Sequence, residues 1–183
     1  MSTTIYTSNG KILVNGSNNK WLKASDVDPY NPLGLPEKTI RIKFKSGYTP
    51  ESNPGYFLVT LVDQANNVWD WTTERTSMSI GGSDHGGSAP IEVLGFNAHG
   101  IESIDLIFVG CSALKNVPLF DASSITSANQ AFAYCTAVES GALAAYNEMA
   151  TKGVASHSGT FTNCGSNTTT GAAELAQIPS GWK

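Results

Sequence analysis

One three-part pattern occurs three times in the second half of the chain, and it limits the folds open to the sequence. In each copy a phenylalanine lies seven positions after an aliphatic residue, and a cysteine lies ten positions after it. The copies are Ile101, Phe108 and Cys111; Ile125, Phe132 and Cys135; and Val154, Phe161 and Cys164. Steps of 24 and 29 residues between the copies are typical of a solenoid, in which each repeat is one supersecondary unit.

The repeat extends beyond the cysteines in both directions. A shift of 24 positions lays residues 93–101 on 117–125, with Val93 falling on Val117 and Phe96 on Phe120, which makes segments 91–96 and 114–120 equivalent. We therefore predict that these two segments are equivalent strands. Residues 175–179 repeat the start of the second segment, which places the end of the array close to the C-terminus.

Two insertions interrupt the period. Residues 141–152 are rich in Ala and carry Tyr146 and Met149 at helical spacing, which predicts a short helix that accounts for the longer third step. Residues 165–171 are polar and are predicted to form a loop. We expect Trp182 to cover the last open face of the array.

The first half of the chain predicts a different, strand-rich structure. Two Asn-Gly pairs in residues 1–24 predict a β-hairpin arm that anchors the protein, and residues 25–38, with three prolines, predict a linker. Residues 39–89 predict an antiparallel β cap with a Gly-rich loop at 76–89. The cap precedes the array at 90–183, so the predicted class is α+β, mostly β: a small antiparallel sheet followed by a short solenoid with one inserted helix.

Composition and charge exclude several classes of protein. The net charge is −4 and the 11 Lys and Arg residues are scattered, so we expect no nucleic-acid partner. No apolar run approaches the ~20 residues that cross a bilayer, so membrane insertion is not expected. The N-terminus has neither a charged region nor an apolar core of a signal peptide, which predicts synthesis in the cytosol.

The second copy resembles the BspA-like leucine-rich repeat. Residues 107–135 read IFVGCSALKNVPLFDASSITSANQAFAYC, and units of that family carry a phenylalanine shortly before a Gly-Cys or Asn-Cys pair, then a serine or threonine and a leucine. The matching residues are Phe108, Gly110, Cys111, Ser112, Leu114 and Val117, then Phe132, Cys135, Thr136 and Val138. The third copy keeps only the first half of the motif. The methionine that usually precedes the phenylalanine is replaced by Ile107, Ala131 and Thr160, so the array, over about residues 90–183, is a divergent one.

The resemblance implies a fold and a class of function. It implies a parallel strand in each repeat, with Phe and Cys inside, and family members are mostly noncatalytic surface or adhesive proteins of bacteria. A short array that follows a strand-rich N-terminal part, as in this chain, also looks like the arrays appended to phage and prophage structural proteins of gut bacteria. We therefore expect a non-enzymatic virion protein, such as a fibre, tail or head decoration protein. Its N-terminal arm would bind other virion proteins, and its array would contact a host surface protein or glycan.

The alternative setting is the bacterial cell surface, with the chain as an adhesin module whose secretion signal was removed. Neither setting requires a cofactor, and a homo-oligomer is compatible with both.

The cysteines are the first candidates for chemistry. Zinc sites usually draw cysteines from close pairs, whereas 24 and 29 residues separate these three. A buried thiol behaves as a small hydrophobe, and one thiol per repeat fills the same interior position. We therefore predict no metal site and no catalytic residue. The predicted structural ladder consists of Cys111, Cys135, Cys164, Phe108, Phe132 and Phe161.

Aromatic residues are the candidates for binding. Trp69, Trp71, Tyr30 and Tyr48 supply large apolar faces suited to a glycan or protein contact. The alternative is that both tryptophans pack beneath the sheet, because their i, i+2 spacing places them on one face of a strand.

Two other groups of polar residues are interpreted as solvated loops. His85, His99 and His157 lack the nucleophile elbow that would make them part of a hydrolase site. Asp26 and Asp28 lack the Gly and the bidentate Glu of a calcium loop.

Overall fold

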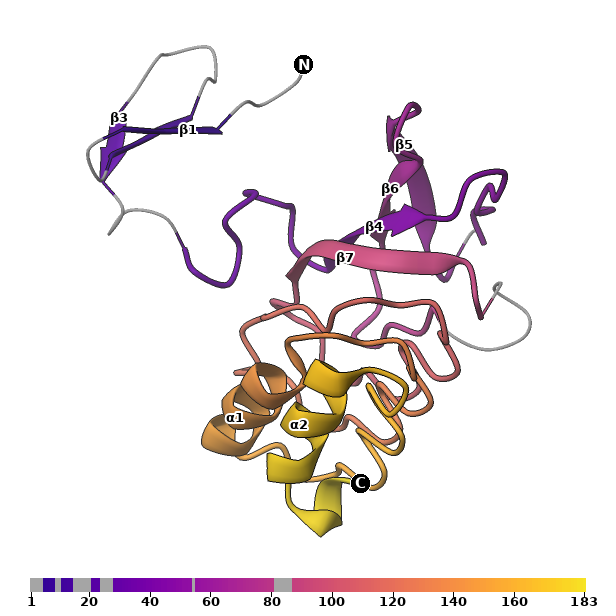
Figure 1. The fold of residues 1–183 in the computed structure, drawn as a ribbon. Coiled ribbons are helices and arrows are strands. Elements are labelled where there is room, and N and C mark those ends of the chain that lie inside the picture. The colour runs from indigo at the N-terminus through magenta and orange to yellow at the C-terminus, as the bar shows by residue number, and fades with distance from the viewer. Residues whose placement is uncertain (1–4, 9–10, 15–20, 24–27, 54, 81–86) are drawn as a thin grey trace.

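The computed structural model describes residues 5–8, 11–14, 21–23, 28–53, 55–80 and 87–183 (Figure 1). The described chain is a mixed α+β structure, mostly β, with an antiparallel four-stranded sheet and two α-helices. The strands are β1 (Ile5–Ser8), β2 (Lys11–Val14), β3 (Trp21–Lys23), β4 (Thr39–Phe44), β5 (Leu58–Asp63), β6 (Val68–Thr72) and β7 (Pro90–Asn97). The helices are α1 (Ala142–Lys152), α2 (Thr169–Gln177) and the 3-10 helix η3 (Ser180–Trp182).

The first three strands form a small antiparallel sheet in the order β1-β2-β3. Ser8 lies opposite Lys11, which fits a two-residue connection between β1 and β2. The two Asn-Gly pairs that predict the turns lie outside the described residues. Figure 1 draws these three strands apart from the four-stranded sheet and the helices.

The four-stranded sheet has the order β5-β6-β4-β7, and all its neighbouring strands are antiparallel. Its inner strand β4 alternates as the sequence predicts: Ile40, Ile42 and Phe44 are buried, whereas Arg41 lies half-buried on the other side. The Arg41 guanidinium donates two hydrogen bonds, of 2.7 and 2.8 Å, to the Asp70 carboxylate on β6. The antiparallel sheet predicted for this part of the chain is thus confirmed.

Strand β7 corrects the prediction that segments 91–96 and 114–120 are equivalent strands. β7 pairs with β4 and is the fourth strand of the sheet, whereas segment 114–120 makes only one isolated bridge, from Asn116 to Ser140. The segments still lie in the predicted register. The Asn116 side chain accepts from the Val93 amide at 2.9 Å and donates to the Val93 carbonyl at 2.8 Å, and so replaces a strand partner. Only the segment with β4 beside it becomes a strand.

Below the sheet the chain forms a series of stacked coils built mainly of turns (Figure 1). Parallel bridges link the same position of successive coils. They join Ser77 to Ser103, Ser103 to Ser127, and Ser127 to Ser156. The parallel strand that the resemblance implies for each repeat is therefore reduced to isolated bridged residues. Residues 77–80 form the first of these bridged segments, although the sequence predicts a flexible loop at 76–89.

A second row of backbone hydrogen bonds connects the coils at their phenylalanines. The Phe108 amide donates to Ala131 at 2.8 Å, and the Phe132 amide donates to Thr160 at 2.9 Å. The Phe161 amide donates to the carbonyl of Trp182 at 2.8 Å, so the C-terminal 3-10 helix takes the place of a further coil. Trp182 is 7% exposed. This position agrees with its predicted role of covering the last coil.

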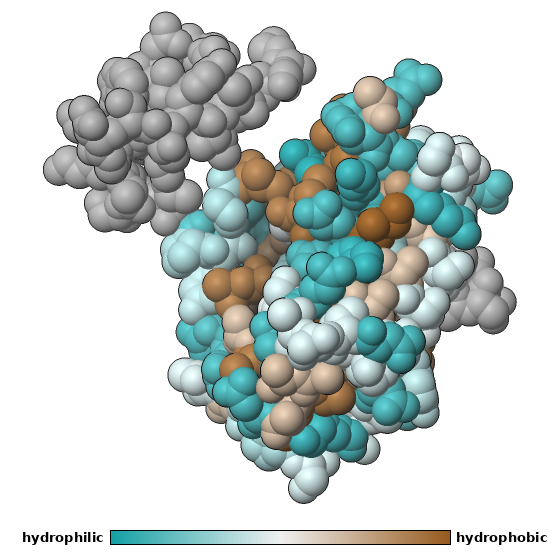
Figure 2. Space-filling model, in the orientation of Figure 1, coloured by the Kyte–Doolittle hydropathy of each residue, from teal (hydrophilic) through white to brown (hydrophobic). Residues whose placement is uncertain are grey.

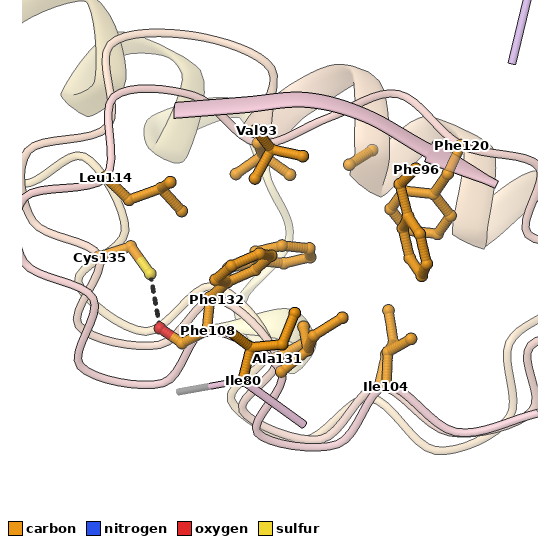
Figure 3. Packing of buried hydrophobic residues seen from close by; sticks show 14 of the residues in the cluster. Ile80, Val93, Phe96, Ile104, Phe108, Leu114, Phe120, Ala131, Phe132 and Cys135 are labelled. Carbon is orange, nitrogen blue, oxygen red and sulfur yellow. Dashed lines mark hydrogen bonds between the residues drawn. The ribbon is translucent and has the colours of Figure 1, made fainter. Parts of the chain in front are cut away.

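The core runs without interruption from the sheet through the coils (Figure 3). The ring of Phe108 stacks on Phe132 with centroids 6.1 Å apart, and Phe132 stacks on Phe161 at 5.6 Å. Nearer the sheet, the rings of Phe96 and Phe120 lie 5.3 Å apart. Each buried aromatic side chain contributes a large apolar area, so these rows supply much of the stability of the coils.

Helix α1 confirms the helix that the sequence predicts at 141–152. Its buried residues are Ala142, Ala145 and Met149, which lie on one face at spacings of three and four. Gly141 precedes the helix with a φ of 92°, and a Cβ atom there would collide with the backbone of Val117. Only glycine fits this position.

Helix α2 corrects the prediction of a loop at 165–171. The helix begins at Thr169 because the Thr168 hydroxyl caps it, accepting from the Gly171 amide at 3.1 Å. On the same helix, Glu174 reaches the start of α1. Its carboxylate accepts from the amides of Gly141 and Leu143 at 3.3 and 3.1 Å, where a helix N-terminus favours negative charge. The described residues therefore contain two α-helices, where the sequence predicts one.

Gly141 and Gly153 give a matched test of this packing. Both have a positive φ, but a Cβ atom at Gly153 meets open space. We expect Gly153→Ala to lower the free energy of unfolding by about 1–2 kcal/mol, the cost of a left-handed backbone. Gly141→Ala adds the collision with Val117, so its loss is about 2–5 kcal/mol. Urea denaturation measures both losses, and equal values would contradict the close approach at Gly141.

Candidate functional site

The structure places all three cysteines in the interior. Cys111, Cys135 and Cys164 are each 0% exposed and none forms a disulfide. The Cys135 thiol donates to the carbonyl oxygen of Phe108 at 3.0 Å (Figure 3). Burial raises the pKa of Cys111 and of Cys164 to about 12, and it raises the pKa of Cys135 well above its ordinary value. Neutral buried thiols are poor nucleophiles and poor metal ligands.

The histidines and the loop carboxylates do not form a reactive group in the part of the chain that is described. The His99 ring lies 3.6 Å from the Glu37 carboxylate, and both side chains are largely exposed. The His157 ring stacks on Trp182, with centroids 3.9 Å apart. Across the described residues, no group of three or more His, Cys, Asp or Glu side chains is arranged to hold a metal ion. His85 and Asp26 lie outside those residues.

The aromatic binding candidates lie at different depths in the sheet. Trp71 is 2% exposed, and its ring stacks on Phe57 with centroids 4.4 Å apart. Trp69 is half-buried and donates from Nε1 to the Asn67 side chain at 2.7 Å. Tyr48 is half-buried beside Phe44, with ring centroids 5.2 Å apart, and burial raises the pKa of its phenol.

The fourth aromatic candidate, Tyr30, lies near the coils. Its hydroxyl donates to Glu148 on α1 at 2.8 Å. This hydrogen bond holds the loop before the sheet against the helix.

Trp71 forms one wall of the candidate site, a cleft of about 320 Å³ that we name the Arg75 cleft. The cleft lies where the chain leaves β6 and enters the first bridged segment of the coils, and strand β5 begins beside it. Its lining includes Tyr56, Phe57, Trp71, Arg75, Ser77 and Met78. Aromatic, cationic and hydroxyl groups therefore meet in one small volume, a combination suited to binding.

Thr73, which is 4% exposed, connects the two sides of the Arg75 cleft, one formed by residues 55–57 and the other by residues 73–78. The Thr73 hydroxyl donates to the Tyr56 carbonyl at 2.6 Å and accepts from the Arg75 amide at 3.1 Å. Arg75 Nε also connects the two sides, because it donates to the Gly55 carbonyl at 2.8 Å. The Arg75 guanidinium carbon lies 3.8 Å from the centre of the Tyr56 ring, a cation–π contact. These contacts fix the ring and the charge relative to each other.

The residues from Tyr56 onward lie in a different part of the sheet from the one that their sequence favours. The apolar run at 56–62 suggests a strand in the centre of the sheet, but β5 is its outer strand. Tyr56 is 54% exposed and Leu58 is 59% exposed. Figure 2 shows apolar side chains in separate small groups among hydrophilic ones on the face it presents.

The sequence prediction names one residue of the Arg75 cleft, Trp71, and misses Tyr56, Phe57 and Arg75. Tyr48 and Trp69 are not part of its lining. Tyr56 and Arg75 are 19 positions apart, and no spacing rule links a residue before one strand to a residue after the next. The local signal is the aromatic pair Tyr56-Phe57 just before β5, and such a pair also fits a core strand.

The raised pKa of Cys111 predicts that its contribution to the stability of the fold depends on pH. An unfolded thiol ionises near pH ~8.5, whereas the folded pKa is about 12. The stability from the neutral buried thiol is thus complete below about pH 8.5 and is lost as the pH rises toward the folded pKa. We expect the stability advantage of the wild type over Cys111→Ala to shrink by about 1.4 kcal/mol per pH unit above pH ~9.

Urea denaturation from pH 7 to 11 measures this change. Val138→Ala, at a buried position without a titratable group, is the matched control and should keep a constant difference from the wild type. A constant difference for Cys111→Ala as well would contradict the raised pKa.

Comparison with known proteins gives no assignment. No family model matches the chain, and no curated protein or solved structure matches it. The function proposed below is argued from the residues and contacts already described.

Proposed function

We propose that this protein is a non-enzymatic structural and binding protein of a phage virion, a fibre, tail or head decoration protein. In this proposal residues 90–183 are a short, divergent leucine-rich-repeat solenoid of the BspA-like type, displayed for attachment to a host surface. The observation that carries the proposal is the stacking of equivalent residues in successive coils. It is strongest at Phe108, Phe132 and Phe161.

The backbone supports the repeat interpretation independently of the side chains. Left-handed φ angles recur at the same position of each coil, with 72° at Gly110, 61° at Tyr134 and 54° at Asn163. These positions follow the same steps of 24 and 29 residues as the cysteines. A shared backbone conformation at equivalent positions is what a solenoid requires.

The interior of the coils favours a scaffold role. It is filled by Phe, Cys, Ala, Ile and Val, which pack but do not carry chemistry at neutral pH. A rigid scaffold of this kind displays its outer surface in a fixed shape, which suits attachment. Within the described residues, no helix is long and apolar enough to cross a membrane.

The N-terminal sheet suits the role of an anchor. A sheet of three short strands is near the lower limit of independent stability, so packing against something larger would stabilise it. In Figure 1 it lies apart from the four-stranded sheet. Docking on another virion protein, or on a second copy of this chain, would supply the missing contact.

Mass spectrometry of purified virions tests the setting. We expect the chain in wild-type virions, and we expect a variant without residues 1–24 to be absent from them while it remains folded by near-UV circular dichroism. If the full chain is found in the cell envelope and not in virions, the adhesin alternative replaces the virion proposal. Retention of the shortened variant in virions would contradict the anchoring role of the arm.

A further inference from the structure

We propose that the Arg75 cleft binds one acidic sugar residue, a pyranose ring that carries a carboxylate. This inference deepens the proposed attachment function and rests on it, because it names the chemistry of the surface that the protein contacts. Three features of the cleft carry the inference: a guanidinium with no counter-charge among the described residues, an aromatic wall, and a volume that fits one ring.

The guanidinium of Arg75 provides the site for the carboxylate. Its Nε is used in the bond to Gly55, while the side chain as a whole is exposed. It forms no ion pair with any residue in the described ranges. A guanidinium presents five N–H donors in a planar fork that matches a carboxylate. The contact with Tyr56 holds this fork in place before a ligand arrives, which lowers the entropy cost of binding.

Arg41 differs from Arg75 because its guanidinium has a carboxylate partner. Its Nε and Nη2 both donate to the Asp70 carboxylate, at 2.7 and 2.8 Å. Arg75 has the same planar group at the edge of a cleft, but no described carboxylate opposite it. An acidic ligand would give Arg75 the partner that Asp70 gives Arg41.

The aromatic residues provide the site for the ring. Tyr56 is 54% exposed and Phe57 is half-buried, whereas Trp71, only 2% exposed, packs behind Phe57 with ring centroids 4.4 Å apart. Aromatic side chains offer broad apolar area, against which the C–H face of a pyranose packs while its hydroxyls stay polar. The exposed residue Ser77 adds a hydroxyl that can bond those of the sugar.

The volume decides the size of the ligand. Small-molecule sites usually occupy about 300–1,000 Å³, and the Arg75 cleft, at about 320 Å³, is at the lower end of that range. It holds one sugar ring rather than a folded peptide segment. With a net charge of −4 on the chain, a single cation in a small cleft selects a carboxylate on a compact ligand, and not a polyphosphate backbone.

Isothermal titration calorimetry with the full chain tests this inference. The ligands are the methyl glycosides of N-acetylneuraminic acid and glucuronic acid, with methyl glucoside as the neutral comparison. We expect at least one acidic glycoside to bind about tenfold or more tightly than the neutral one, the worth of a charge-assisted hydrogen bond. Added salt should weaken the acidic ligand alone.

Arg75→Gln should remove this preference, and Arg75→Lys should recover only part of it, because lysine keeps the charge but not the fork. Lys45→Gln removes an exposed cation outside the lining and is the matched control, with binding unchanged. Thermal unfolding checks that each variant is folded. Tyr56→Ala removes the exposed ring and its contact with the Arg75 guanidinium, so it should weaken both kinds of glycoside and the acidic one more strongly.

Three results would overturn the inference: no binding of any glycoside, equal binding of acidic and neutral glycosides, or tighter binding of a short peptide through its C-terminal carboxylate. None of them bears on whether the chain is in virions, which mass spectrometry decides separately. Conversely, sugar binding by a chain that is absent from virions would overturn the virion setting and leave the ligand assignment standing.

Discussion

Hydrogen bonds between the backbones of neighbouring coils are the constraint on which the rest of this structure depends. Each coil consists mainly of turns, so many of its buried amides have no partner within the coil, and an unpaired buried amide is costly. The next coil supplies the carbonyl: Phe108 bonds to Ala131, and Phe132 bonds to Thr160. Each end of the array therefore needs a segment that supplies the backbone hydrogen bonds that a further coil would supply. At the C-terminal end that is the carbonyl of Trp182, and at the other end the segment 77–80 adds its amides to Ser103 and Ile107.

The sheet and the coils share strand β7, and this explains why their core is continuous. One edge of β7 pairs with β4, while its other edge meets the Asn116 side chain and the Lys115 amide from the next coil. The sheet thereby covers the first coil in the way that Trp182 covers the last. The Arg75 cleft lies at this same junction, where the chain passes from β6 to the first bridged segment. Its walls are therefore held by both parts of the fold.

The sequence predicts the parts of this fold that depend on burial at regular spacing. Phe108, Phe132 and Phe161 indicate the period because each fills the same buried position of its coil, and residues 39–45 indicate β4 because apolar and polar residues alternate. Predictions fail where distant contacts decide. Helix α2 begins in a run of Thr and Gly with low helix propensity, and it is supported by its cap at Thr168 and by the contact of Glu174 with α1.

The candidate site could not be predicted from the sequence for a similar reason, since contacts between distant segments form it. Tyr56 and Arg75 meet only because buried Thr73 bonds to both segments and because β5 and β6 pair side by side. Neither residue lies in a motif, and the exposed tyrosine follows from the position of β5 at the edge of the sheet. Whether a strand lies at the edge or in the centre depends on the assembled sheet, and the residue pattern of one strand does not determine it.

The unequal steps between repeats show where this chain tolerates change in length. Phe132 and Phe161 remain stacked at 5.6 Å although five more residues separate them than separate Phe108 from Phe132. Helix α1 takes up the extra length outside the interior rows, and Glu174 holds its first turn in place. A change of length at this corner is therefore compatible with the stacked rings, provided that it keeps the buried face of Ala142, Ala145 and Met149. Inserted residues that stay on the exposed side of the corner would reshape the outer surface and leave the aromatic interior in place.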